Sequence, residues 1–229
     1  MKVIRIACWL ITSMIPLAAT DAALLGFEED FQDGHTANWG GGSERYTPVS
    51  TGGAGGTLDG FLEVANDTET KNLGVFNSQA EYTGNLTSEG VTGFSFWLKD
   101  TGDDDNLEIH VGVGTALMNI WFSQDGFLPS ETDWEKFSVD ITDSSKWTQT
   151  QGSGTFENAI NNSNRLLFRH DSPPLETGPE KVNSEFGIDR IRVVPEASTF
   201  PLLLLGFVIF RFSRLAVVKK RSKQEPKTS

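Results

Sequence analysis

Short runs of alternating apolar and polar residues constrain this sequence most strongly. The clearest run is Leu107-Glu108-Ile109-His110-Val111-Gly112-Val113, which has an apolar residue at every second position. A period of two predicts a strand with one face in a core and the other toward solvent. Further candidate strands, each bounded by Gly, Asp, Asn, Ser or Pro, are Phe61–Ala65, Val91–Lys99, Met118–Phe122, Trp134–Ile141, Leu166–His170 and Phe186–Val194.

The spacing of these runs predicts an all-β fold, a jelly-roll β-sandwich made of residues 23–194. A stretch of about 170 residues is long enough to enclose one core, and the 16 Phe of the chain supply bulk for it. Gly40–Gly42 and Gly52–Gly56 mark loops. Only Thr155–Asn161 has a weak helical pattern.

The N-terminus has the layout of a secretory signal peptide, which we assign to residues 1–22. Basic residues in Met1–Arg5 precede an apolar stretch, Ile6–Leu17, and small residues follow through Ala23. An uncleaved membrane anchor is the alternative. The single cysteine, Cys8, lies inside this segment, so the exported domain is expected to fold without disulfides.

The charge is divided between the body and the tail of the chain. Residues 23–194 hold 28 Asp and Glu against 10 Lys and Arg, and the tail from Arg211 holds 7 basic residues against 1 acidic residue. An acidic exported domain repels the phosphates of nucleic acids, so we do not expect this protein to bind nucleic acids. A basic tail suits the cytoplasmic side of a membrane.

The C-terminal segment begins with Val194-Pro195-Glu196-Ala197-Ser198. A helix over residues 200–218 would be about 28 Å long, close to one hydrocarbon core. Arg211 and Arg214 fall inside that span and would have to reach toward the interface. Residues 219–229 form the basic end.

This arrangement resembles a PEP-CTERM sorting signal, with Ala197 where a second proline is usual. The resemblance covers 195–229 and the preceding Val194. It implies a Gram-negative bacterium, an exosortase-like membrane enzyme as partner, tethering at the inner membrane, and release to the cell surface or extracellular matrix. An ordinary tail anchor is the alternative.

The body resembles bacterial carbohydrate-binding modules of the jelly-roll type. The residues that carry the resemblance are Leu25-Gly26-Phe27-Glu28, the segment Asp133–Ile141, and the final run Phe186–Val193. The resemblance implies a sandwich whose terminal strands are neighbours. It also implies one structural calcium ion at their edge.

Glu28, Asp30 and Asp189 are the expected calcium ligands, since calcium prefers six to eight oxygen ligands. Several carboxylates without a cation would repel one another. The alternative is a solvated acidic edge. Asp103-Asp104-Asp105-Asn106 is a second acidic group, interpreted as a hairpin loop.

Trp147 and Trp121 are the candidate glycan-binding residues, because aromatic rings stack on sugars and Trp147 stands in a polar stretch. Packing in the core is the alternative for both. No catalytic residue is assigned. Glu131, Asp133 and Glu135 have the spacing of a jelly-roll glycosidase motif, but Pro129-Ser130 places Glu131 in a turn.

The sequence therefore predicts an exported, non-enzymatic surface protein with a structural or adhesive role among exopolysaccharides. A carbohydrate-binding module proper is the first alternative. A jelly-roll glycoside hydrolase is a distant second.

Overall fold

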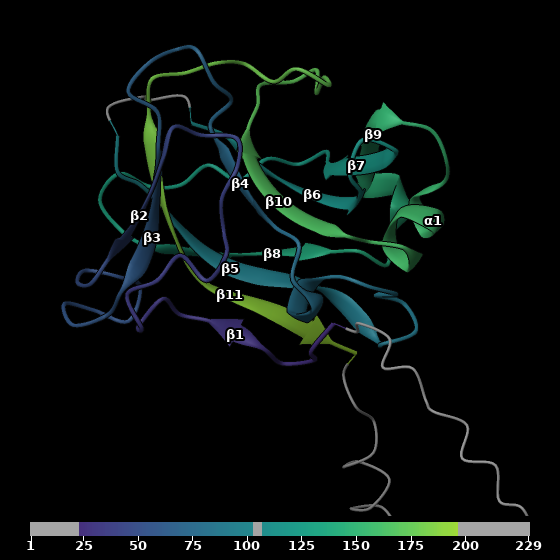
Figure 1. The fold of residues 1–229 in the computed structure, drawn as a ribbon, viewed down its shortest axis with the longest axis horizontal. Coiled ribbons are helices and arrows are strands. Elements are labelled where there is room, and N and C mark those ends of the chain that lie inside the picture. Colours follow the sequence, from purple (N-terminus) through teal and green to yellow (C-terminus); the bar gives the residue numbers. More distant parts are fainter. Residues whose placement is uncertain (1–22, 103–106, 197–229) are drawn as a thin grey trace, which may run out of the picture.

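The computed structural model describes residues 23–102 and 107–196, which form two antiparallel sheets packed face to face (Figure 1). The six-stranded sheet has the order β2-β3-β11-β5-β8, and β1 also pairs with β11. Its strands are β1 (Glu28–Glu29), β2 (Arg45–Val49), β3 (Phe61–Ala65), β5 (Val91–Asp100), β8 (Glu135–Asp140) and β11 (Glu185–Pro195).

The five-stranded sheet has the order β4-β10-β6-β7-β9. Its strands are β4 (Gly74–Asn77), β6 (Ile109–Thr115), β7 (Asn119–Ser123), β9 (Trp147–Gly152) and β10 (Arg165–His170). One short helix, α1 (Phe156–Asn161), and two single 3₁₀ turns, η1 (Ala80–Tyr82) and η2 (Ser144–Lys146), connect the strands. Each sheet joins strands that are far apart in sequence.

Every strand expected from periodicity is present, within two residues at each end, and the all-β sandwich is confirmed. The weak helical stretch is α1, which Thr155 caps through a hydrogen bond from the Asn158 N–H. Strands β2, β4 and β9 were not anticipated. Their sequences are short or polar, as in Trp147-Thr148-Gln149-Thr150-Gln151-Gly152 of β9, so they lack an alternating pattern.

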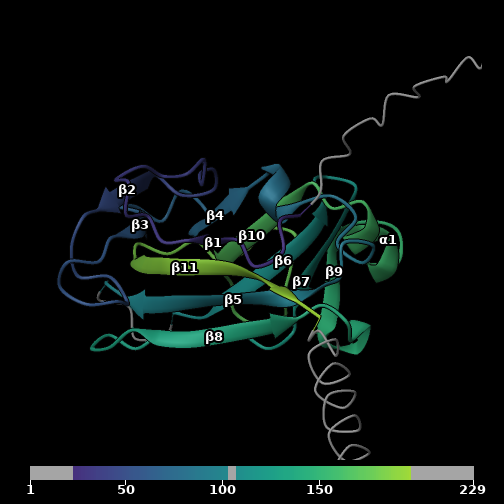
Figure 2. The same ribbon diagram turned by 90° about the horizontal axis from the view of Figure 1, so that it is seen from below.

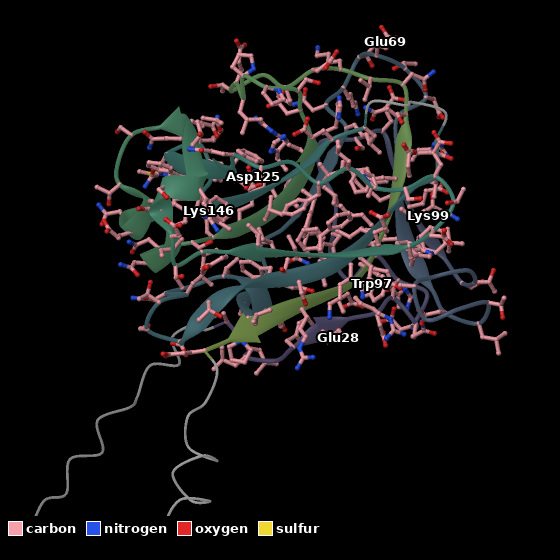
Figure 3. The ribbon with its side chains drawn as sticks, turned by 180° about the vertical axis from the view of Figure 1, so that it is seen from behind. Glu28, Glu69, Trp97, Lys99, Asp125 and Lys146 are labelled. Carbon is pink, nitrogen blue, oxygen red and sulfur yellow. The ribbon has the colours of Figure 1, made fainter. Side chains whose placement is uncertain are left out.

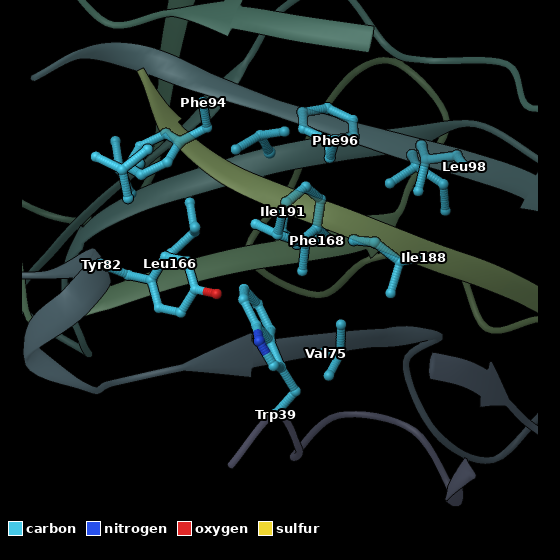
Figure 4. Packing of buried hydrophobic residues seen from close by; sticks show 14 of the residues in the cluster. Trp39, Val75, Tyr82, Phe94, Phe96, Leu98, Leu166, Phe168, Ile188 and Ile191 are labelled. Carbon is cyan, nitrogen blue, oxygen red and sulfur yellow. The ribbon is translucent and has the colours of Figure 1, made fainter. Parts of the chain in front are cut away.

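Aromatic side chains fill the space between the sheets (Figure 4). The rings of Phe96 on β5 and Phe168 on β10 meet edge to face, with centres 4.8 Å apart. Trp39 packs against Phe168 and Tyr82, and all of these side chains are almost completely buried. These contacts join the two sheets into one core. Aromatic side chains bury large apolar areas, so they supply much of the packing in such a core.

The first and last strands are neighbours, as the resemblance implied. β1 pairs with β11, with Glu28 opposite Arg192, and Figure 2 shows β1 and β11 side by side. Val194 and Pro195 of the expected sorting motif belong to β11, and the Glu196 N–H donates to the Gly90 carbonyl at 2.9 Å.

Several sequence expectations lie outside the described residues. These are the signal peptide at 1–22, the acidic segment 103–106, Ala197 and Ser198, the span 200–218 and the basic end 219–229. Within the described ranges, no helix has both the length and the hydropathy needed to cross a membrane.

A β-bulge interrupts β11 between Asp189 and Arg192. Phe186 and Ile188 point into the core before the bulge, and Ile191 resumes the inward position after it. Arg190 has a φ of 48°, a left-handed conformation that is uncommon outside glycine. The bulge therefore turns both Asp189 and Arg190 away from the core.

Candidate functional site

A row of residues runs across the outer face of the five-stranded sheet. Phe76 on β4 lies opposite Leu167 on β10, Leu167 opposite Gly112 on β6, and Gly112 opposite Phe122 on β7. Leu166, the neighbour of Leu167, belongs to the core. Because side chains alternate between the two faces of a strand, the row lies on the face away from the core.

At Gly112 this row has no room for a side chain. A Cβ atom at this position would lie 2.6 Å from Cε1 of the Phe122 ring, closer than real atoms approach. Glycine therefore leaves the space in which the Phe122 ring lies. Gly41, which has a φ of 76°, leaves similar space for the ring of Phe76.

Two arginines of β10 lie over these rings. Arg165 and Arg169 flank Leu167 at alternate positions, so all three side chains share the outer face. The guanidinium carbon of Arg165 is 3.8 Å from the centre of the Phe76 ring. That of Arg169 is 3.9 Å from the centre of the Phe122 ring. Each pair makes a cation–π contact, so guanidinium groups occupy one face of each ring.

Phe76, Phe122, Leu167 and the two arginines line a hollow of about 240 Å³. Polar residues also line it, including Asn72, Thr150 and Gln151. Thr177, from the segment between β10 and β11, donates its hydroxyl hydrogen to the Thr150 carbonyl and also lines the hollow. Pockets for drug-sized molecules measure about 300–1,000 Å³. This hollow therefore suits a small ligand or a short stretch of a polymer better than a large enclosed ligand.

The charge in the hollow is positive. Burial lowers the pKa of both Arg165 and Arg169 from the usual guanidinium value, and Asp171 opposes this effect at Arg169. Guanidinium groups stay protonated at neutral pH even after such a change. Among the described residues, no Asp or Glu side chain lines the hollow.

The two tryptophans expected to bind a ligand lie elsewhere. Trp147 is only 3% exposed, stacks on Phe156 with ring centres 5.0 Å apart, and donates its indole N–H to the Asp140 carbonyl. The expectation that Trp147 is exposed was wrong. Its polar neighbours belong to a strand whose first residue points into the core.

Trp121 on β7 also faces away from the hollow. Its indole N–H donates to Asn119 at 2.9 Å, and its ring meets the edge of Phe156. Ile120 and Phe122, on either side of it, line the hollow instead. The sequence showed an alternating strand here, but it gave no sign of which face would be open.

The three carboxylates expected to hold calcium are not brought together. Glu28 is exposed at the edge of the sandwich (Figure 3), opposite Arg192, with 3.9 Å between their charged groups. Asp30 accepts a hydrogen bond from the Gln32 N–H. Asp189 is completely buried and accepts from the N–H groups of Ala54 and Arg190.

Asp189 has a different acidic neighbour, Asp59, which the sequence did not single out. Asp59 forms an ion pair with Arg190 and accepts hydrogen bonds from Gln32 and Gly55. Burial is the largest influence on Asp189 and raises its pKa to about 7; the nearby Asp59 also raises it, and two backbone hydrogen bonds oppose the change. In the described part of the chain, no group of three or more His, Cys, Asp or Glu is arranged to hold a metal ion. Calcium stays a prediction.

The glycosidase-like spacing falls at the entry to β8. Glu131 and Asp133 are exposed in the loop before the strand, and Glu135 is its first residue. β8 is an edge strand of the six-stranded sheet, whereas the hollow lies on the other sheet. These three carboxylates are therefore not part of the hollow.

No known protein family matches the sequence, and no curated protein matches it either. Solved structures do match the fold. One is the family 11 carbohydrate-binding module of a cellulosomal cellulase of Clostridium thermocellum, at 16% identity and a TM-score of 0.51, covering 77% of this chain and 98% of that one. The shared feature is the fold, a sandwich of two β-sheets.

A second match is to an exo-β-agarase, at 11% identity and a TM-score of 0.53. It covers 76% of this chain and 26% of the agarase, so this chain corresponds to about a quarter of that protein. At such identities the likeness establishes the shared sandwich alone.

Proposed function

We propose that this chain is an exported, non-enzymatic polysaccharide-binding protein of the cell surface or extracellular matrix. Its binding site is the hollow on the outer face of β4-β10-β6-β7-β9. A short stretch of glycan lies over Leu167, between the guanidinium groups of Arg165 and Arg169. The resulting role is structural or adhesive, with the domain attached to exopolysaccharide.

The observation that carries this proposal is the hollow itself, which combines an apolar floor with polar and charged groups along its sides. Sugars present apolar ring faces and a fringe of hydroxyl groups, and such a surface matches both. The matching family 11 protein is named as a carbohydrate-binding module, and the match covers 98% of its chain. That likeness favours a glycan over other small ligands.

The carboxylates Glu131 and Asp133 do not favour a glycosidase. Retaining enzymes need two carboxyl groups about 5 Å apart on either side of the bond that is cleaved. Here both residues are exposed in a loop next to the sheet opposite the hollow. The proposal therefore assigns them no chemical step.

Binding to immobilised or soluble polysaccharides tests the proposal directly. We expect the full chain to bind at least one member of a panel of neutral and charged polysaccharides. Leu167→Trp would fill the hollow and weaken that binding at least tenfold. Met118→Trp, at a position that is 68% exposed and not among the residues lining the hollow, would change it less than twofold. Equal binding by both variants would contradict this site.

Sorting through Val194–Ser198 and the tail is the second part of the proposal. The exosortase-like partner would recognise Pro195-Glu196 and the span 200–218 and would remove the tail. Mass spectrometry of the mature protein from its native cell would then show a C-terminus near residue 198. A mature protein that ends at Ser229 would contradict processing and favour an ordinary tail anchor.

A further inference from the structure

Arg165 differs from every other arginine in the described residues. Four of the five form an ion pair with a carboxylate: Arg45 with Asp67, Arg169 with Asp171, Arg190 with Asp59, and Arg192 with Glu28. Arg165 has no ion pair and no side-chain hydrogen bond to the described part of the chain. Its single specific contact is the Phe76 ring.

The lack of a carboxylate partner is unexpected for such an acidic body. Residues 23–194 contain 28 Asp and Glu against 10 Lys and Arg, so carboxylates outnumber cations almost three to one. The Arg165 side chain is partly buried, and its Nε, like that of Arg169, is among the buried polar atoms of the described residues without a partner. A buried donor without an acceptor is costly, and a charged one more so. A ligand anion beside the guanidinium would balance its charge.

The position of Arg165 makes it available to such a ligand. It lines the hollow together with Arg169, whose Nη2 already donates to Asp171 at 2.7 Å and to the Glu176 carbonyl at 2.6 Å. The two Cα atoms are four residues apart on one strand, or about 13 Å. Among the residues that the structure describes, Arg165 is thus the cation of the hollow without a carboxylate partner, whereas Arg169 is paired with Asp171.

We infer that the hollow selects an anionic glycan, a polysaccharide whose sugar residues carry carboxylate or sulfate groups. The anionic group of one sugar accepts hydrogen bonds from the guanidinium of Arg165, which is held in place over Phe76. Planar guanidinium groups form paired hydrogen bonds with carboxylates and sulfate-like oxyanions. This inference rests on the proposed function, because it names the class of glycan for the same site.

The carboxylates of the body repel an anionic glycan mainly at long range. Charges further apart than about 8 Å are largely screened at physiological salt, whereas a contact inside the hollow is screened little. Arg165 would contact its anion directly. The surrounding carboxylates therefore slow the approach of an anionic polymer more than they weaken the bound state.

The test compares glycans that differ only in charge, with the full chain as it exists. Polygalacturonate and its fully methyl-esterified form share the same sugar backbone, and dextran sulfate against dextran gives the sulfate arm. We expect one charged polymer to bind at least tenfold more tightly than its neutral match. The arm in which this occurs identifies the anion.

Variants assign the preference to Arg165. Arg165→Gln should weaken binding of the charged polymer at least tenfold, and Arg165→Lys should recover part of the loss. Arg192→Gln removes the same charge outside the hollow and should change binding less than twofold. The comparison of polymers needs no variant, so it decides the question even if a substitution at Arg165 unfolds the protein.

The outcomes separate the inference from the proposed function. Tight binding of a neutral glycan that is lost in Leu167→Trp and unchanged in Arg165→Gln overturns the anionic preference and leaves the glycan site intact. Binding of no polysaccharide overturns both. Equal binding of the charged and neutral members of each pair also overturns the anionic preference.

Discussion

Arg190 and Asp59 form an ion pair, with Nη2 of the arginine 3.2 Å from Oδ2 of the aspartate, across 131 residues of sequence. The pair ties the β-bulge of the last long strand to the loop that follows β2. Asp189 lies beside it, completely buried, with its two carboxylate oxygens accepting from the N–H groups of Ala54 and Arg190. This cluster holds the glycine-rich loop Gly52–Gly56 against the six-stranded sheet.

The burial of Asp189 predicts that protein stability falls as the pH rises. Its pKa is about 7 in the folded state, against 3.8 as the ordinary value. The stability linked to its neutral form is therefore fully present below about pH 4 and is lost as the pH rises through about 7. Asp189→Asn cannot ionise, so the wild type's stability relative to this variant should fall by about 1 to 4 kcal/mol between these limits.

Denaturant unfolding over a pH series measures this difference. Asp125→Asn removes the same charge from an exposed position and serves as the control. If the stability difference between wild type and Asp189→Asn stays constant or grows between about pH 4 and 7, folding does not raise the pKa of Asp189 and the assignment is wrong.

Gly112→Ala should destabilise the protein and distort the hollow. The added methyl group would lie 2.6 Å from the Phe122 ring, which Arg169 covers from the other direction. Overpacking of this kind costs about 1 to 3 kcal/mol. Chemical denaturation gives the stability change, and Gly178→Ala, where a methyl group meets open space, is the matched control. An unchanged stability in Gly112→Ala would show that the Phe122 ring moves freely.

Trp147→Ala should lower the free energy of unfolding by about 3 to 5 kcal/mol, because it removes a large buried ring. The ring is 3% exposed and stacks on Phe156. Met118→Ala, at an exposed position, should change stability by less than about 0.5 kcal/mol. Thermal or denaturant unfolding compares the two. Loss of glycan binding by folded Trp147→Ala with no loss of stability would restore the ligand-binding interpretation.

A structural calcium ion predicts a higher Tm in calcium than in a chelator. Glu28, Asp30 and Asp189 are the ligands expected from the sequence, although the structure does not group them around one point. The increase in Tm should be specific for calcium over magnesium and should be lost in Asp189→Asn. An identical Tm with calcium and with chelator would refute the ion.

Local patterns were sufficient for much of the fold. Alternation at Leu107–Val113 and Val91–Lys99 predicted strands, because burial of one face imposes a period of two on the sequence. Alternation does not tell which face will be covered. Trp121 and Phe122 are adjacent on β7, so their side chains point to opposite faces of the sheet. The pairing of β7 with β6 and β9 places Phe122 in the lining of the hollow and Trp121 on the other face.

The sequence by itself determined that this chain forms an all-β sandwich, because burial of one strand face imposes a local period of two. The neighbouring terminal strands were implied by a family resemblance, and the pairing of β1 with β11 shows them. The tertiary structure alone decided the sites. Phe76, Phe122 and Arg165 come from three strands that are far apart in sequence, and only register across β4, β10, β6 and β7 places them in one hollow. Asp59 and Arg190 pair for the same reason. Their contact depends on strand pairing across 131 residues, which no short segment of the sequence can predict.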